Sequence, residues 1–202
     1  RMIENDLKGR NINDEKILNA FLEVPREKFV SERYYKEAYA DSPLPIEEGQ
    51  TISQPYIVAE MIKAANPSSK DKALEVGSGS GYASALLSQL VKKVYGIERF
   101  ESLVKKSRSN LRQLGYENIS IKKGDGSKGW EEKSPFDIII VSAAASEVPE
   151  ELLEQLAENG KMVIPVGSQF RQELVCYKKE NDKISKRVIT FVRFVPLISE
   201  ES

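Results

Sequence analysis

A buried strand that runs directly into a glycine-rich turn constrains the fold of this chain more than any other feature. Residues 74–82 read LEVGSGSGY, and helical spacing follows over residues 83–90. Three glycines at alternate positions remove side chains where a backbone turns sharply and approaches another group closely. The helix that follows offers unpaired N–H groups at its start. The stretch predicts a ligand site, and a strand-to-helix turn without a ligand stays open as the alternative.

Strand and helix patterns alternate along the chain from residue 72 onwards. Apolar runs of strand length occur at residues 73–76, 94–97, 119–122, 136–141 and 161–166. Helices are expected between them at residues 83–90, 100–114 and 149–157. Two last strands, 173–178 and 184–195, are separated only by the turn 180–182, which predicts an antiparallel C-terminal hairpin. We expect an α/β fold with a doubly wound, mostly parallel seven-stranded sheet of the Rossmann-like type.

The N-terminal part of the chain lacks this alternation and predicts helices and a loop. Apolar residues at helical spacing, Leu22 among them, indicate a helix over residues 13–22 with Asn13 as its cap. Short helical turns are expected within residues 27–34. An irregular connection over residues 38–50 contains two prolines and a glycine, and long loops of this kind are often functional.

A further helix, over residues 56–65, is expected to close this region. Pro55 suits its first turn, and Ser53 is placed to cap it. At 202 residues the chain fits one domain, with N-terminal helices and a loop at 1–70 and a sheet core at 71–198.

The composition restricts the chemistry. The chain has no histidine, which excludes a Ser-His-Asp triad, a Cys-His pair and a histidine-ligated metal. Cys176 is the only cysteine, and its apolar alternating run predicts a structural thiol. We expect no metal site and a reaction that needs little proton transfer or takes its reactivity from a cofactor.

Charge and hydropathy narrow the expected partners. The formal net charge of −1 provides no field towards nucleic acid or a membrane surface. No apolar run approaches the roughly 18 residues that a spanning helix needs, and no signal-like start is visible. With a single cysteine, these features predict a cytoplasmic protein; they carry no signal for an oligomeric state.

Acidic residues follow the first strands at positions that suit a nucleoside. Glu98 ends the second strand, 21 positions after Gly77, where it can accept hydrogen bonds from ribose hydroxyls. The dinucleotide pattern needs a third glycine one position later than Gly81. Glu75 would repel a pyrophosphate but can hold a cation or an ammonium group. Asp125, between two glycines, could accept a hydrogen bond from an adenine amine or simply belong to a turn.

These features resemble the class I S-adenosylmethionine-dependent methyltransferases. In that family the glycine turn contacts the methionine part of the cofactor, the acidic residue holds the ribose and the next loop holds adenine. The resemblance implies a single methyltransferase domain over residues 1–202, with S-adenosyl-L-methionine as its cofactor. The residues that it implies for cofactor binding are Glu75, Gly77, Ser78, Gly79, Glu98, Arg99, Asp125 and Gly126.

Motifs outside the shared core resemble the protein-L-isoaspartate O-methyltransferases. They are PLPI at 43–46, GQTISQP at 49–55, GDG at 124–126, VSAAA at 141–145 followed by VP at 148–149, the stretch 160–167, and FVPL at 194–197. The motif at 49–55 is much more specific than the glycine turn. The resemblance implies methyl transfer to the α-carboxylate of L-isoaspartyl residues in damaged proteins or peptides, which starts their repair through a succinimide.

The same resemblance implies the substrate residues. It places Ser53 at the active site as the catalytic residue, with Thr51, Ile52 and Gln54 lining the substrate pocket. A carboxylate is already ionised at neutral pH and needs no general base, so we expect Ser53 to orient it rather than attack. Tyr56 is a departure, because some relatives carry histidine there.

Rival functions fit the residues less well. A small-molecule O- or N-methyltransferase is the first alternative. A nucleic-acid base methyltransferase usually needs an Asn/Asp-Pro-Pro-aromatic patch after the fourth strand, and residues 142–145 read SAAA. The glycine spacing and Glu75 disfavour an NAD-dependent oxidoreductase. A non-enzymatic nucleoside-binding module leaves residues 50–55 unexplained.

Overall fold

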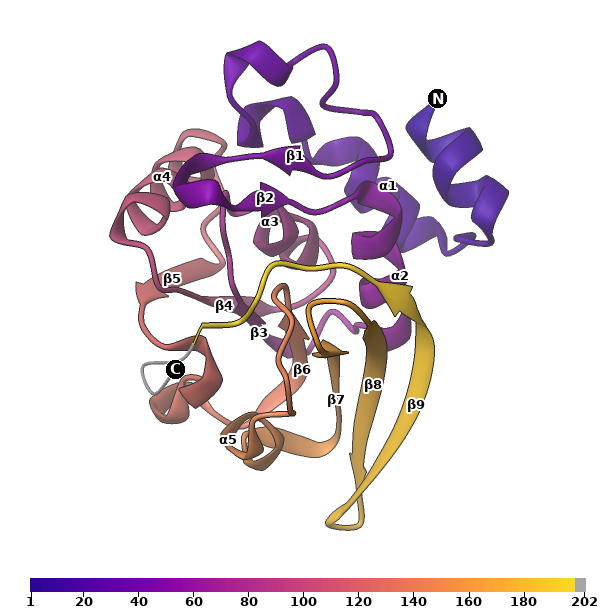
Figure 1. Ribbon diagram of the computed structural model, residues 1–202, viewed down its shortest axis with the longest axis vertical. Coiled ribbons are helices and arrows are strands. Elements are labelled where there is room, and N and C mark those ends of the chain that lie inside the picture. Colours follow the sequence, from indigo (N-terminus) through magenta and orange to yellow (C-terminus); the bar gives the residue numbers. More distant parts are fainter. Residues whose placement is uncertain (199–202) are drawn as a thin grey trace.

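Seven strands form one sheet in the order β5-β4-β3-β6-β7-β8-β9 (Figure 1). The computed structural model describes residues 1–198. Strands β3 to β7 pair in parallel, and β8 and β9 add an antiparallel hairpin at one edge. The strands are β3 Lys72–Val76, β4 Lys93–Glu98, β5 Ile119–Lys123, β6 Phe136–Val141, β7 Leu156–Gly167, β8 Gln172–Glu180 and β9 Lys183–Val192. The predicted fold class is confirmed.

The hairpin and the last parallel strands differ in extent from the prediction. Asn181 and Asp182 both have positive φ, of 52° and 55°, as a two-residue type I′ turn requires. The expected strand 184–195 ends at Val192, which pairs with the first residue of β8; of residues 193–198, only Pro196 forms a further β-bridge, to Ala144. The helix expected at 149–157 covers only Glu150–Glu154, because Leu156 already belongs to β7, where it pairs with Phe136 of β6.

Helices cover both faces of the sheet, and the strands are apolar on both sides as buried parallel strands are. The helices are α1 Glu15–Glu23, α2 Pro55–Ala65, α3 Tyr82–Ser88, α4 Glu101–Gln113 and α5 Glu150–Glu154. Ala73, Ile138 and Ile140 pack into one core with α1 to α4, whereas the alternate residues Leu74 and Ile139 pack into the other core, with α5. Within residues 1–198, no helix is long and apolar enough to cross a membrane.

The first helix begins and packs differently from the expectation. Asp14, rather than Asn13, caps α1: its carboxylate accepts hydrogen bonds from the N–H groups of Lys16 and Ile17, at 2.9 and 3.3 Å. Leu22 lies at the edge of the buried stripe and is 64% exposed, so its predicted burial is wrong. The short helical turns expected within residues 27–34 occur at Arg26–Phe29 and Glu32–Tyr34, and two further turns that were not predicted lie at Met2–Leu7 and Lys8–Arg10.

The connection expected to be irregular contains a small antiparallel hairpin. Strands β1 Leu44–Pro45 and β2 Thr51–Ile52 pair across a turn at Glu47–Gly49. Figure 1 shows this hairpin lying over α3. Ile46 reaches the glycine turn, since a Cβ placed on Gly79 would lie 3.3 Å from its Cδ1 atom. The hairpin therefore places the motif at residues 49–55 next to the glycine turn.

Candidate active site

The glycine turn lies at the point where the strand order reverses. After β3, the chain adds β4 and β5 on one side of the sheet and then returns to place β6 on the other side of β3. In open α/β sheets, the carboxyl ends of the strands at such a switch point form the ligand crevice. Gly77 has φ of 81°, and a Cβ there would lie 3.7 Å from the backbone of Ser142, which follows β6. The turn therefore needs glycine for its conformation and lies close to the neighbouring strand end.

Three cavities open around this turn. The strand-end cavity is lined by Gln50, Thr51, Val76, Gly77, Gly79, Ile97, Glu98, Arg99, Phe100, Gly126, Ser142, Ala143, Val195, Pro196, Leu197 and Ile198. The outer cavity, of about 410 Å³, is lined by Pro43, Thr51, Ser53, Gln54, Ile57, Ser142 and residues 191–195. The inner cavity is lined by Thr51, Ile52, Ser53, Val58, Glu75, Gly77, Ser78, Gly79, Ser80, Tyr82, Ala83 and Ser142. Thr51 and Ser142 line all three and mark their junction.

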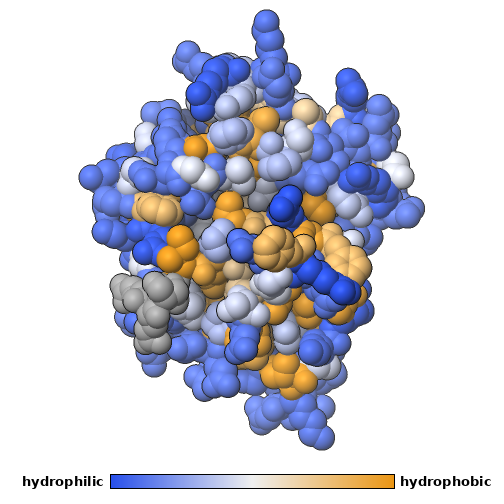
Figure 2. All heavy atoms as spheres, viewed as in Figure 1, coloured by the Kyte–Doolittle hydropathy of each residue, from blue (hydrophilic) through white to orange (hydrophobic). Residues whose placement is uncertain are grey.

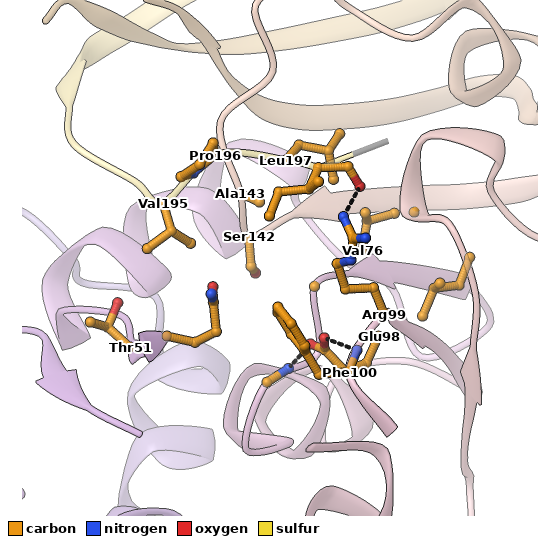
Figure 3. A pocket seen from close by; sticks show the side chains of 16 residues that line it. Thr51, Val76, Glu98, Arg99, Phe100, Ser142, Ala143, Val195, Pro196 and Leu197 are labelled. Atoms are coloured by element: carbon orange, nitrogen blue, oxygen red, sulfur yellow. Dashed lines mark hydrogen bonds between the residues drawn. The ribbon is translucent and has the colours of Figure 1, made fainter. Parts of the chain in front are cut away.

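Glu98 is held rigidly at the wall of the strand-end cavity (Figure 3). Its Oε2 accepts a hydrogen bond from the Gly79 N–H at 2.9 Å, and its Oε1 accepts one from the Phe100 N–H at 3.0 Å. The side chain is 6% exposed. A carboxylate oxygen has two lone pairs, so each oxygen can accept a further hydrogen bond from a ligand hydroxyl.

A strap of chain after β9 closes the strand-end cavity on its other side. This segment runs back across the carboxyl ends of the strands (Figure 1), where Leu197 N–H donates to the Ala144 carbonyl at 2.7 Å. The Arg99 guanidinium donates to the Ile198 carbonyl at 3.2 Å. Apolar residues gather across the middle of this face (Figure 2). Val195, Pro196 and Leu197 thus give the cavity an apolar wall suited to a flat ring.

Glu75 is a buried carboxylate beneath the glycine turn. It is 1% exposed and accepts hydrogen bonds from the hydroxyls of Ser84 in α3 and Ser142, the latter at 3.3 Å. Burial raises the pKa of Glu75 from its ordinary 4.5 to about 8, although both hydroxyls act in the opposite direction. No cation pairs with Glu75 in residues 1–198, and it lines the inner cavity. The site therefore favours a cationic ligand group, which would compensate the buried charge.

Ser53 does not cap α2, so the capping alternative is excluded. Gln54 occupies the N-cap position and makes no capping hydrogen bond with its side chain. The first turn is capped from a distance instead, because Asp41 accepts a hydrogen bond from the Tyr56 N–H at 2.9 Å. The Asp41 carboxylate also accepts a hydrogen bond from the side-chain amide of Gln54 at 2.7 Å. The Ser53 side chain is half-buried between the outer and inner cavities.

The outer cavity has an exposed cation and an exposed ring at its rim. Arg193 is the only charged side chain of its lining, and it makes no ion pair or hydrogen bond with the residues that the structure describes. Phe191 is 61% exposed. The cavity can therefore receive a solvent-borne anionic group beside Ser53.

Most predicted site residues meet in these cavities. Only Asp125 lines none of them: its carboxylate accepts hydrogen bonds from the N–H and hydroxyl of Ser127, as a turn aspartate does. Its neighbour Gly126 lines the strand-end cavity, where a Cβ would clash with Val76. The sequence analysis assigns no role to Ser142 or Arg193, although Ser142 belongs to the VSAAA motif and Arg193 directly precedes FVPL. Within residues 1–198, no cluster of three or more Cys, Asp or Glu side chains could hold a metal.

Comparison with known proteins identifies close relatives. Residues 1–202 match the family described as protein-L-isoaspartate(D-aspartate) O-methyltransferase (PCMT). A protein-L-isoaspartate O-methyltransferase of Koribacter versatilis is 50% identical over 201 residues, covering 100% of this chain and 90% of that protein. A solved PCMT from Plasmodium falciparum, in complex with S-adenosyl-L-homocysteine, is 34% identical with a TM-score of 0.85, covering 98% of this chain and 96% of its own. A second solved protein-L-isoaspartate O-methyltransferase is 30% identical with a TM-score of 0.88; the match covers 96% of this chain and 64% of that one.

Proposed function

This chain belongs to the protein-L-isoaspartate(D-aspartate) O-methyltransferase family, and we propose which of its three cavities bind the cofactor and which one binds the substrate. The enzyme transfers the methyl group of S-adenosyl-L-methionine to the α-carboxylate of L-isoaspartyl residues in damaged proteins or peptides. The resulting ester decays through a succinimide, which starts repair. The observation that supports this assignment is that the three cavities meet at Thr51 and Ser142, which line all of them.

The strand-end and inner cavities hold the cofactor. Glu98 receives the ribose hydroxyls, since both its oxygens lie fixed at the cavity wall. Gly126 and the apolar strap leave room for adenine, and Arg99 fixes the end of that strap. Glu75, a buried carboxyl group without a cationic partner in residues 1–198, ionises when the ammonium group of the methionine part binds in the inner cavity and then pairs with it. When bound, the sulfonium of the cofactor supplies an electrophilic methyl group.

The outer cavity holds the isoaspartyl residue. Its α-carboxylate is ionised at neutral pH and is itself the nucleophile, so the site needs no general base. The Ser53 hydroxyl donates a hydrogen bond to one carboxylate oxygen and leaves the other directed at the junction. Arg193 attracts the carboxylate from the rim. Rate enhancement comes from this orientation and from exclusion of water.

The expected partners are isoaspartyl-containing proteins in the cytoplasm. The net charge of −1 provides no electrostatic attraction to nucleic acid, which supports the absence of a nucleic-acid partner. The thiol of Cys176 is buried and forms no disulfide, which suits a reducing compartment.

A labelling assay tests this function directly. Purified protein is mixed with S-adenosyl-L-methionine carrying a radiolabelled methyl group and with one peptide in isoaspartyl and aspartyl forms. We expect base-labile label in the isoaspartyl peptide only. Equal labelling of both peptides, or none, would contradict the assignment, and base-stable label on a small molecule would favour the small-molecule alternative.

A further inference from the structure

Arg26 is a buried cation without an anionic partner. It follows α1, in the turn Arg26–Phe29, and is 0% exposed. No carboxylate lies within ion-pair distance of it in residues 1–198, and burial lowers the pKa of its guanidinium, which remains protonated at physiological pH. An unpaired buried charge is costly, and an apolar side chain of similar size would avoid that cost. The presence of a buried arginine at this position therefore indicates a functional role.

The guanidinium joins three segments of the chain, two of which line the inner cavity. Nε donates to the Ala38 carbonyl at 2.8 Å, and Nη2 donates to the Ser53 carbonyl at 2.8 Å. Its carbon atom Cζ lies 4.7 Å from the centre of the Tyr82 ring. Nη1 and the Tyr82 hydroxyl are both buried; neither makes a hydrogen bond of good geometry, and the guanidinium and the hydroxyl interact electrostatically with each other.

The contact with Ser53 matters because Ser53 belongs to no regular element. Strand β2 ends at Ile52 and helix α2 begins at Pro55, so neither a ladder nor a helix fixes the serine backbone. The Arg26 fork fixes its carbonyl instead. Ser53 lines both the outer and the inner cavity, and Tyr82 lines the inner one, so Arg26 lies directly behind the serine that separates the two cavities.

We propose that Arg26 is a positioning residue for methyl transfer, which holds Ser53 and Tyr82 in register and places a buried positive charge behind the carboxylate site. The proposal rests on the proposed role of Ser53. The planar fork reaches two carbonyls from one side chain, which a lysine ammonium on its flexible stem does not reproduce. Loss of the fork misplaces the Ser53 hydroxyl, and loss of the charge weakens attraction of the substrate carboxylate.

The two contributions can be separated with Arg26→Lys, which keeps the charge, and Arg26→Met, which keeps only the length. With saturating cofactor and an isoaspartyl peptide, we expect Arg26→Lys to lower kcat about tenfold with a nearly unchanged KM. Arg26→Met should lower kcat similarly and also raise KM about tenfold. The Kd of S-adenosyl-L-homocysteine should stay within about threefold in both, and its binding stoichiometry gives the folded fraction used to correct kcat.

A stability control and a double mutant decide between positioning and packing. Ile164→Ala removes a fully buried side chain from the opposite core and should lower Tm without changing KM or the corrected kcat. In the Ser53→Ala background, Arg26→Lys should have little further effect, because it acts through that hydroxyl. Wild-type corrected kcat and KM in Arg26→Lys, or additive effects in the double mutant, would overturn the proposal and leave the role of Ser53 standing. Unchanged turnover in Ser53→Ala alone would instead contradict the role of Ser53 and, with it, this proposal.

Discussion

The Gly79 N–H donates a 2.9 Å hydrogen bond to Oε2 of Glu98, 19 positions later in the chain. This bond joins the glycine turn after β3 to the carboxylate at the end of β4. The turn is anchored to the same strand a second time, because the Gly77 N–H donates to the Ile97 carbonyl at 2.8 Å. The glycine turn and the acidic residue therefore form one preorganised unit rather than two independent ligand contacts.

Removal of the Glu98 carboxylate should weaken cofactor binding most. Glu98→Ala removes the expected ribose acceptors and leaves the Gly79 N–H without its partner. Hydrogen bonds to charged groups contribute about 1.5–3 kcal/mol, so we expect Kd for S-adenosyl-L-homocysteine to rise about 10- to 150-fold by calorimetry. Glu98→Asp, which keeps the charge, should lose less. At saturating cofactor, kcat of Glu98→Ala should change little. An unchanged Kd in this variant would contradict the ribose assignment.

Ser53→Ala should lower turnover without unfolding the protein. Because Asp41 rather than Ser53 caps α2, we expect Tm to stay within about 2 °C of wild type, as for a change that loses no cap. The lost hydrogen bond to the substrate carboxylate should lower kcat/KM about 10- to 100-fold. Asp41→Ala is the matched control and should lower Tm through α2. Loss of folding in Ser53→Ala would contradict the structure on this point.

The sheet and its glycine turn could be predicted from sequence because their signals are local. Apolar runs define β3 to β7, and alternate glycines define a turn that only glycine can form. The short strands β1 and β2 gave no such signal, because two residues are too few to show a period. The turn between them contacts α4 far along the chain, where Glu47 lies 3.8 Å from Lys106 and Glu48 accepts a hydrogen bond from the Ser102 hydroxyl.

Contacts between side chains far apart in the sequence could not be predicted either. Asp41 caps α2 from 15 positions before Tyr56, and Arg26 reaches Ser53 from 27 positions away. No spacing rule predicts such contacts, because they depend on how the N-terminal turns fold back over the sheet. The substrate motif itself came from family resemblance, since Ser53 alone was equally compatible with a helix cap.

Arg193→Gln should raise KM for the isoaspartyl peptide and should not lower kcat. The substrate carboxylate carries a full charge before reaction and loses it as the methyl group is transferred, so Arg193 stabilises the bound substrate more than the transition state. An exposed ion pair contributes about 0.2–1 kcal/mol, which corresponds to a rise in KM of about 1.4- to fivefold. Salt should raise KM of the wild type and have a smaller effect on the variant. Arg112→Gln, an exposed change in the last turn of α4 and outside the cavity lining, is the control. A fall in kcat would contradict this role.

The free enzyme should lose stability as the pH rises from about 5 to 8. Burial raises the pKa of Glu75 to about 8 in the folded protein, against an ordinary 4.5 when unfolded. Between these values the folded state binds one proton more than the unfolded state, so the free energy of unfolding falls as pH rises, by at most about 1.4 kcal/mol per pH unit. Urea titrations across this range measure the slope. Glu75→Gln should flatten it, and an identical slope in the variant would exclude Glu75 as its source.

Cofactor binding should release protons from the same carboxylate. At pH 7 Glu75 is mostly protonated in the free enzyme, because its pKa is about 8. A cationic group in the inner cavity favours the ionised form and lowers that pKa, so binding releases up to about one proton. Calorimetry at pH 7 in phosphate and in Tris, buffers with different ionisation enthalpies, measures the number released. Glu75→Gln removes this contribution and retains only that of the amine of the cofactor. Equal proton release by variant and wild type would show that the cation does not bind beside Glu75.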